Sequence, residues 1–169
     1  MIYGYCIMPT HIHLIVQSHT NPLVSVIRDF KKFTYAKIAN IAKSNEHYLN
    51  YMNEFKKAAV GIKLNKLVKV WQDGYHPEII FSNTFFFQKL NYIHNNPVVA
   101  GIVSSPIDYY YSSARNYAGL DAPLKIIFES RQVISYKYKL CRHVSENKTR
   151  ANGAIAALVY YFFVLMGWN

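Results

Sequence analysis

The 169-residue sequence is poor in cysteine, in glycine and in acidic residues. Its two cysteines, Cys6 and Cys141, argue against a disulfide framework and against a zinc site built from cysteines. No glycine-rich nucleotide loop and no nucleophilic serine motif is present, so an ATPase or a serine hydrolase has no support in the sequence. Nine acidic residues stand against nineteen lysines and arginines, and the net charge of +10 favours a polyanionic partner.

Signals for secretion and for membrane insertion are also lacking. The first residues have neither the basic start nor the apolar block of a signal peptide, so we expect a cytoplasmic protein. The apolar run over residues 154–168 is shorter than the roughly twenty residues that span a bilayer, which favours a buried segment over a membrane helix. Hydrophobic residues make up 51% of the chain, enough for one folded domain of ordinary size.

Two histidines separated by one apolar residue, His11 and His13, are the most informative feature of the chain. Residues 11–16 are apolar and β-branched, which predicts a strand. Successive side chains of a strand point to opposite faces, so both imidazoles should lie on one face and the apolar residues should face a core on the other. Two adjacent imidazoles suit one divalent ion, and two ordinary strand histidines explain the spacing equally well.

A hairpin and an amphipathic helix are predicted around this strand. Residues 2–8 form the partner strand, and the turn falls at residues 9–10. Asparagine followed by proline at residues 21–22 predicts a helix start, and apolar residues recur at helical spacing as far as Ile41. The opposite face of this helix is basic and would suit phosphate contacts, although a solvated surface is the more frequent explanation: Arg28, Lys31, Lys32 and Lys37.

The middle of the chain shows weaker patterns. We expect a second helix and a loop over residues 44–66, followed by strand-like pieces at 68–71 and 78–81 around a turn at 73–74.

A second candidate group lies on a predicted helix over residues 84–95, which Pro97 should stop. Its buried stripe should consist of Phe86, Leu90 and Ile93. Tyr92 and Asn96 are four residues apart and share one face if the helix holds through its last turn. The phenol of Tyr92 can be a nucleophile, and the amide oxygen of Asn96 is a hard donor for a metal. Most of the fifteen tyrosines must be packing residues, so the type of residue alone does not identify a nucleophile. His94 points to another side, where a structural role is expected.

Several segments of the sequence resemble one known family. Residues 5–16 are similar to the histidine–hydrophobic–histidine (HUH) block of the single-tyrosine HUH transposases, the insertion-sequence-200-like enzymes that include the REP-associated tyrosine transposases. Residues 92–103 resemble their catalytic-tyrosine block, and residues 106–114 resemble the segment that follows it. Residues 71–76 fit the region in between. The blocks are co-linear over residues 1–124, which makes the resemblance specific.

The resemblance implies a role for each matching residue. His11, His13 and Asn96 would bind Mg²⁺ or Mn²⁺, and Tyr92 would attack a phosphorus of single-stranded, hairpin-bearing DNA. The product would be a covalent 5′-phosphotyrosine link and a free 3′-hydroxyl, so that a strand can later be rejoined without ATP. No small-molecule cofactor is expected, and relatives include both monomers and homodimers. Further DNA contacts are expected from Lys31, Lys32, Lys89, Arg115 and His76, although for His76 we favour an ordinary loop histidine.

The implied fold is α+β: an antiparallel-sheet HUH domain, ferredoxin- or RRM-like, with helices on the sheet. Relatives carry a strand and a helix before the block that opens this chain, so we expect both to be missing and a sheet edge to be exposed. We expect a partial catalytic domain over 1–124 and a divergent tail with an apolar end over 125–169. The alternatives are a catalytically inactive DNA-binding remnant and a small membrane-associated protein.

Overall fold

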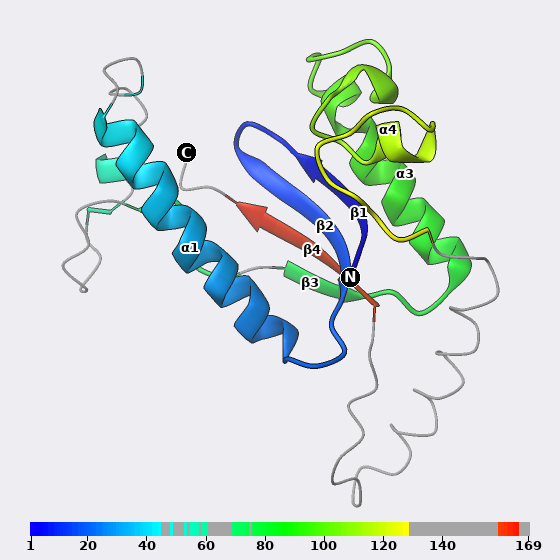
Figure 1. The fold of residues 1–169 in the computed structure, drawn as a ribbon, viewed down its shortest axis with the longest axis horizontal. Helices are drawn as coiled ribbons and strands as arrows, with labels where there is room; N and C mark the ends of the chain where they lie inside the picture. Colours follow the sequence, from blue (N-terminus) through cyan, green and yellow to red (C-terminus); the bar gives the residue numbers. More distant parts are fainter. Residues whose placement is uncertain are drawn as a thin grey trace, which may run out of the picture. The chain divides into compact units, whose positions relative to one another are not determined.

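The computed structural model describes residues 1–44, 48, 53, 55–57, 59–60, 69–74, 76–128 and 159–165 (Figure 1). The chain forms two compact units, one of Met1–Thr20 and Pro77–Phe163 and the other of Asn21–His76 and Val164–Asn169. Helices and strands are mixed, so the predicted α+β class is confirmed. Most of the helix and loop expected over 44–66 lies outside the described residues.

The predicted hairpin is confirmed. Strands β1 (Ile2–Ile7) and β2 (His11–Gln17) pair antiparallel, with Cys6 opposite His13. The amide of Met8 donates to the carbonyl of His11 at 2.8 Å and closes the turn. This register fixes the positions of both histidines at the start of β2, directly after the turn.

The hairpin belongs to a four-stranded sheet with the order β1-β2-β4-β3, in which β3 is His76–Ile79 and β4 is Val159–Leu165. Strand β4 lies in the apolar run near the C-terminus, for which the sequence predicts burial but no type of element. The tail thus contributes a strand to the same sheet as the hairpin, and the domain boundary expected after residue 124 stays a prediction. Among the described residues, no helix has both the length and the apolar character needed to cross a membrane.

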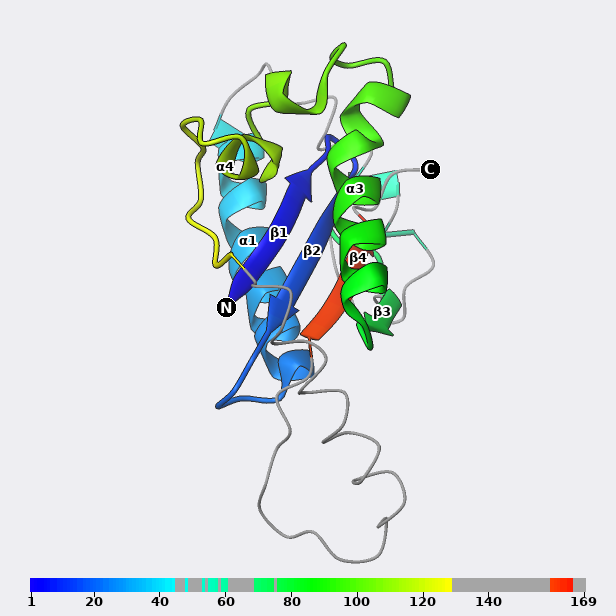
Figure 2. The same cartoon turned by 90° about the vertical axis from the view of Figure 1, so that its right-hand side faces the viewer.

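Helix α3 (Asn83–Val99) covers one face of the hairpin (Figure 2). The Ser82 hydroxyl accepts a hydrogen bond from the amide of Phe85 at 3.1 Å and caps the first turn. The predicted apolar stripe is buried, and together with residues of the strands it forms the core: Tyr3, Cys6, Met8, Ile15, Ile80, Phe86, Leu90 and Ile93. Because this stripe is buried, the rotation of α3 about its own axis is fixed, and so is the direction of its outer face.

The prediction that Pro97 stops this helix is wrong, because α3 continues through the proline to Val99. The helix ends instead at Gly101, whose φ of +68° is the left-handed conformation that glycine adopts readily. The amide of Gly101 donates to the carbonyl of Val98 and that of Ile102 to the carbonyl of Pro97, both at 2.9 Å. These bonds satisfy the last carbonyls, so the final turn survives the missing amide of the proline.

Helix α3 and strand β1 approach each other closely at Gly4. A β-carbon built on Gly4 would lie 2.7 Å from Leu90 Cδ1, 3.2 Å from Ile93 Cδ1 and 3.5 Å from Ile15 Cδ1. A side chain at this position would force its neighbours to shift, and the sequence contained no signal for this contact.

The outer edge of β1 is covered, contrary to the exposed edge that we expected for a missing strand. The segment over residues 109–117 runs along it, and the amide of Ile7 donates to the carbonyl of Tyr111 at 2.9 Å. Ser113 and Tyr5 share three hydrogen bonds. The Ser113 amide donates to the Tyr5 carbonyl and the Ser113 hydroxyl accepts from the Tyr5 amide, both at 2.9 Å, and the same hydroxyl lies 3.1 Å from the Tyr5 carbonyl. The Tyr117 hydroxyl donates to the Tyr3 carbonyl at 3.0 Å. Backbone groups that would otherwise attract another strand are thereby satisfied.

The second unit contains helix α1 (Leu23–Ser44), which confirms the predicted amphipathic helix. Phe30 of α1 packs against Trp71, with 5.7 Å between ring centroids, and the indole of Trp71 donates to the Thr34 hydroxyl at 2.8 Å. Trp71 is buried, so its side chain anchors α1 within this unit.

Candidate active site

The four residues expected to form a site converge in the first unit. Helix α3 places the Tyr92 ring edge-on to the His13 ring, with 5.5 Å between centroids. The rings of His11 and His13 lie 4.8 Å apart, and the side chains of His13 and Asn96 are hydrogen-bonded. Residues separated by about eighty positions in the sequence thus form one cluster.

The prediction placed a core only on the face of β2 opposite the histidines, whereas the structure has buried residues on both faces. Strand alternation places Ile15 on the same face, and Ile15 belongs to the core under α3. Ile12 and Val16 on the opposite face are buried as well, so β2 is covered on both sides. His13 is only 1% exposed and lies where this core gives way to the polar side chains of Tyr92 and Asn96.

Asn96 is oriented by its own helix. Its Nδ2 donates to the carbonyl of Tyr92 at 2.8 Å, a bond between neighbouring turns that confirms their predicted proximity. The contact between Asn96 and His13 raises the pKa of the imidazole, as an acceptor does when it faces a protonated ring. Because Nδ2 is bonded to the Tyr92 carbonyl, the carboxamide oxygen, which is the metal-binding atom of an asparagine, is the atom of this side chain that can accept.

Both histidines are held in the neutral form. Burial is the main cause that lowers the pKa of His13 to about 3, and His11 and the Lys89 ammonium lower it further. Burial also lowers the pKa of His11. A neutral imidazole offers a nitrogen lone pair, so at physiological pH no proton competes with a metal ion at this site.

Thr10 orients His11. Its hydroxyl lies 3.0 Å from Nδ1 of the His11 ring. When Nδ1–H donates to this hydroxyl, the lone pair is on Nε2, which is then the nitrogen for a metal. In the sequence Thr10 is predicted to lie in the turn, within the motif but outside the proposed ligands, and its position next to a candidate ligand is the signal that points to this role.

A row of aromatic and cationic side chains leads along α3 to Tyr92. The rings of Phe81 and Phe85 are stacked, with centroids 4.7 Å apart and planes inclined by 15°. The Lys89 ammonium lies 5.3 Å from the Phe85 centroid and 6.0 Å from the Tyr92 centroid, and it forms a 2.7 Å ion pair with Glu78. This aromatic row, defined here as Phe81, Phe85, Lys89 and Tyr92, presents flat apolar surfaces beside a positive charge.

Two other predicted residues of this unit serve the scaffold. Arg115 donates from Nε to the carbonyl of Asp121 at 2.6 Å and from an Nη to the carbonyl of Ile107 at 2.9 Å. His94 Nε2 lies 2.7 Å from the Ser113 hydroxyl, and burial lowers the pKa of His94 to about 4. The placement of His94 agrees with the structural role expected for it.

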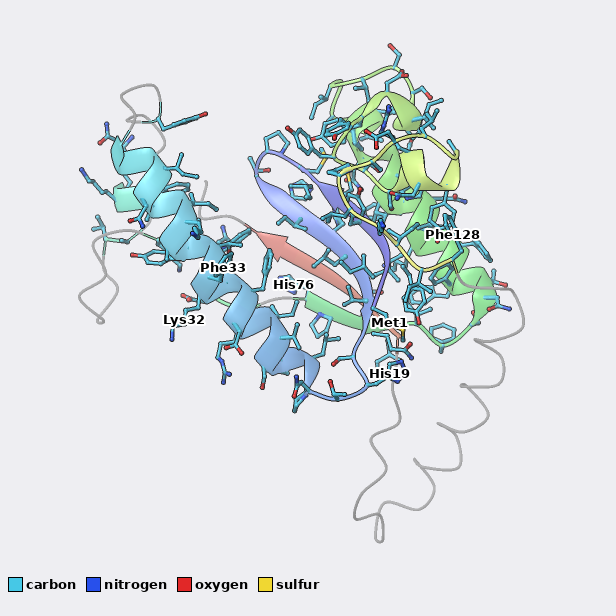
Figure 3. All side chains as sticks on the ribbon, in the orientation of Figure 1. Met1, His19, Lys32, Phe33, His76 and Phe128 are labelled. Carbon is cyan, nitrogen blue, oxygen red and sulfur yellow. The ribbon has the colours of Figure 1, made fainter. Side chains whose placement is uncertain are left out.

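The remaining predicted DNA contacts lie in the second unit. The Lys31 ammonium donates to the carbonyl of Gln72 at 2.8 Å and to that of Gly74, so it binds a turn of its own unit. Lys32 projects from α1 and is exposed, and His76 is exposed at the start of β3 (Figure 3).

The donor set of the cluster fits a divalent ion with two imidazoles and one carboxamide. Among the described residues, no three histidine, cysteine, aspartate or glutamate side chains come together, and the third donor of the cluster is the carboxamide of Asn96. Comparison with protein-family models, with curated proteins and with solved structures finds no match for this chain.

Proposed function

We propose that the protein is a metal-dependent DNA strand transferase of the single-tyrosine HUH transposase type, with an HUH-like α+β fold. Its substrate is single-stranded DNA that carries hairpins, and its reaction is cleavage and rejoining during DNA transposition. The observation that carries this proposal is the convergence of His11, His13, Tyr92 and Asn96, because a nucleophile and three metal donors from separate sequence blocks meet at one place.

His11, His13 and Asn96 would hold a Mg²⁺ or Mn²⁺ ion. When bound, the ion supplies Lewis-acid stabilisation of the negative charge on the phosphate. The chain's contribution is preorganisation: burial keeps the imidazoles neutral, Thr10 orients His11, and the bond from Nδ2 to the Tyr92 carbonyl orients Asn96.

Tyr92 is the proposed nucleophile. Its side chain is 54% exposed, so a DNA strand can reach it, while its ring edge contacts His13. The Tyr92 oxygen forms a bond to phosphorus as the bond between phosphorus and the 3′-oxygen breaks. The phenol loses its proton and the departing 3′-oxygen gains one, which leaves the 5′-phosphate on the protein. Rejoining is the reverse reaction with another 3′-hydroxyl.

The aromatic row and the net charge of +10 support a single-stranded substrate. An unpaired base can stack on the exposed ring of Phe81, whereas the bases of a duplex are already stacked on each other. The Lys89 ammonium between Phe85 and Tyr92 is placed to attract the backbone of the same strand.

Covalent capture tests the proposal. The full chain is incubated with Mn²⁺ and a pool of 3′-labelled hairpin oligonucleotides with randomised flanks, and adducts are separated on denaturing gels. We expect a labelled protein band with the wild type and none with Tyr92→Phe. Tyr111→Phe is the matched control, since Tyr111 is 52% exposed and lies outside the cluster.

Two results would contradict the proposal. A wild-type protein that forms no adduct with any member of the pool would be the DNA-binding remnant. An adduct that persists in Tyr92→Phe would show that another residue is the nucleophile.

A further inference from the structure

A pocket of about 710 Å³ lies on the outer side of α3, next to Tyr92. Its volume is within the range of about 300–1,000 Å³ that is typical of small-molecule sites. Carboxamides dominate its polar lining: Gln88, Asn91, Asn95 and Asn96. The first three recur at the spacing of helical turns, so one rigid element presents them together.

The lining of the pocket holds no lysine, arginine, aspartate or glutamate within the described part of the chain. His94 is the imidazole of the lining, and its Nε2 lies 2.7 Å from the Ser113 hydroxyl. A phosphate group would find no cation here, so the pocket suits a neutral polar ligand.

The other walls are apolar. Val99 comes from the last turn of α3, and Pro106 and Ile107 come from the short helix η2 (Pro106–Asp108). Arg115 holds this wall in place by donating to the carbonyl of Ile107 at 2.9 Å. Flat apolar contacts on one side and hydrogen-bonding amides on the other match a planar heterocycle.

We propose that this pocket binds one unpaired nucleobase of the DNA strand next to the phosphate that Tyr92 attacks, and that its carboxamides discriminate between bases. Each carboxamide has an acceptor and a donor side by side, so it pairs bidentately with a base edge. No hydrogen bond among the described residues engages the side chains of Gln88, Asn91 or Asn95, which leaves these groups to a ligand. This inference rests on the proposed function, because the position of Tyr92 links the base to the reaction.

Binding of short homo-oligonucleotides tests the inference. The affinities of the full chain for oligomers of dA, of dC and of dT are measured by fluorescence anisotropy without metal. We expect the ratio of the tightest to the weakest affinity to be about fivefold or more, which is the discrimination that one bidentate pair of hydrogen bonds provides. Asn91→Ala and Asn95→Ala should abolish this ratio, and both residues are exposed, so neither change should disturb folding.

Asn40→Ala is the matched control, because Asn40 is an exposed asparagine on α1, outside the pocket. It should leave the ratio unchanged. Equal binding of all three oligomers by the wild type, or a ratio that survives in both pocket variants, would overturn the inference.

The two proposals fail separately. An adduct with Tyr92 but no base discrimination leaves strand transfer standing and removes the base pocket. Discrimination that disappears in the pocket variants, without any adduct, leaves the base pocket standing and removes strand transfer.

Discussion

The close approach of α3 to β1 predicts that Gly4→Ala destabilises the protein and moves the site. The added β-carbon would lie 2.7 Å from Leu90 Cδ1, a distance that β-carbons essentially never show. Leu90 is buried in the core, so its side chain has little room to turn away. We expect the helix to shift outwards by a few tenths of an ångström, and Tyr92 to move with it away from His13.

The magnitude follows from two opposing effects. Overpacking a well-packed core costs about 1–3 kcal/mol. Replacing glycine by alanine recovers about 0.4–1 kcal/mol, because the unfolded chain loses freedom and Gly4 does not have a positive φ. The free energy of unfolding should therefore fall by about 1.3 kcal/mol, the difference between the middle values of the two ranges.

A double-mutant cycle isolates the contact. Leu90→Val removes the methyl group that meets the new β-carbon and by itself costs about 1 kcal/mol. In Gly4→Ala/Leu90→Val the two changes compensate, so the loss should be smaller than the sum by about 1 kcal/mol. Urea denaturation of the four proteins measures the cycle, and the yield of the covalent adduct reports the position of Tyr92.

Additive losses would refute this reasoning, since they would show that Gly4 and Leu90 do not meet as described. So would an unchanged stability in Gly4→Ala alone.

Three further predictions concern the protonation, the metal and the DNA contacts of the site. The folded-state pKa values of His13 (about 3) and His94 (about 4) lie below 6.5, so the unfolded chain binds more protons as the pH falls below 6.5. The metal-free protein should lose about 2 kcal/mol of stability per histidine between about pH 7 and about pH 5 in urea titrations, whereas a flat profile contradicts the burial of both. Thr10→Val should weaken Mn²⁺ binding about tenfold in calorimetry, because His11 loses its orienting partner; unchanged affinity argues against that role. Lys89→Met should weaken binding of single-stranded DNA and lower its salt dependence by about 0.7 in the logarithmic slope, and an unaltered slope would place this lysine away from the DNA backbone.

Local patterns predicted much of the region that positions the site. Strand alternation placed His11 and His13 together, and helical spacing placed Tyr92 beside Asn96, because both depend only on neighbours along the chain. The end of α3 was predicted wrongly, because the hydrogen bonds around Gly101 outweigh the usual effect of a proline at position 97.

Other contacts between distant segments were not predictable from the sequence. Nothing near Gly4 indicates that Leu90 will pack on it, and nothing near Tyr5 indicates that Ser113 will cover its edge. The residues of β4 are aromatic and β-branched, which is typical of a strand, but an unbroken apolar run has no period that separates a buried strand from a buried helix.

The bonds between Tyr5 and Ser113 have a consequence for the protein during its synthesis. The two residues are 108 positions apart, so the hairpin leaves the ribosome long before the segment that covers its edge. Until then the backbone of β1 can pair with another nascent chain, and contacts that close so long a loop form slowly. We therefore expect a chaperone that shields strand edges to raise the yield of this protein, by occupying β1 until Ser113 is available.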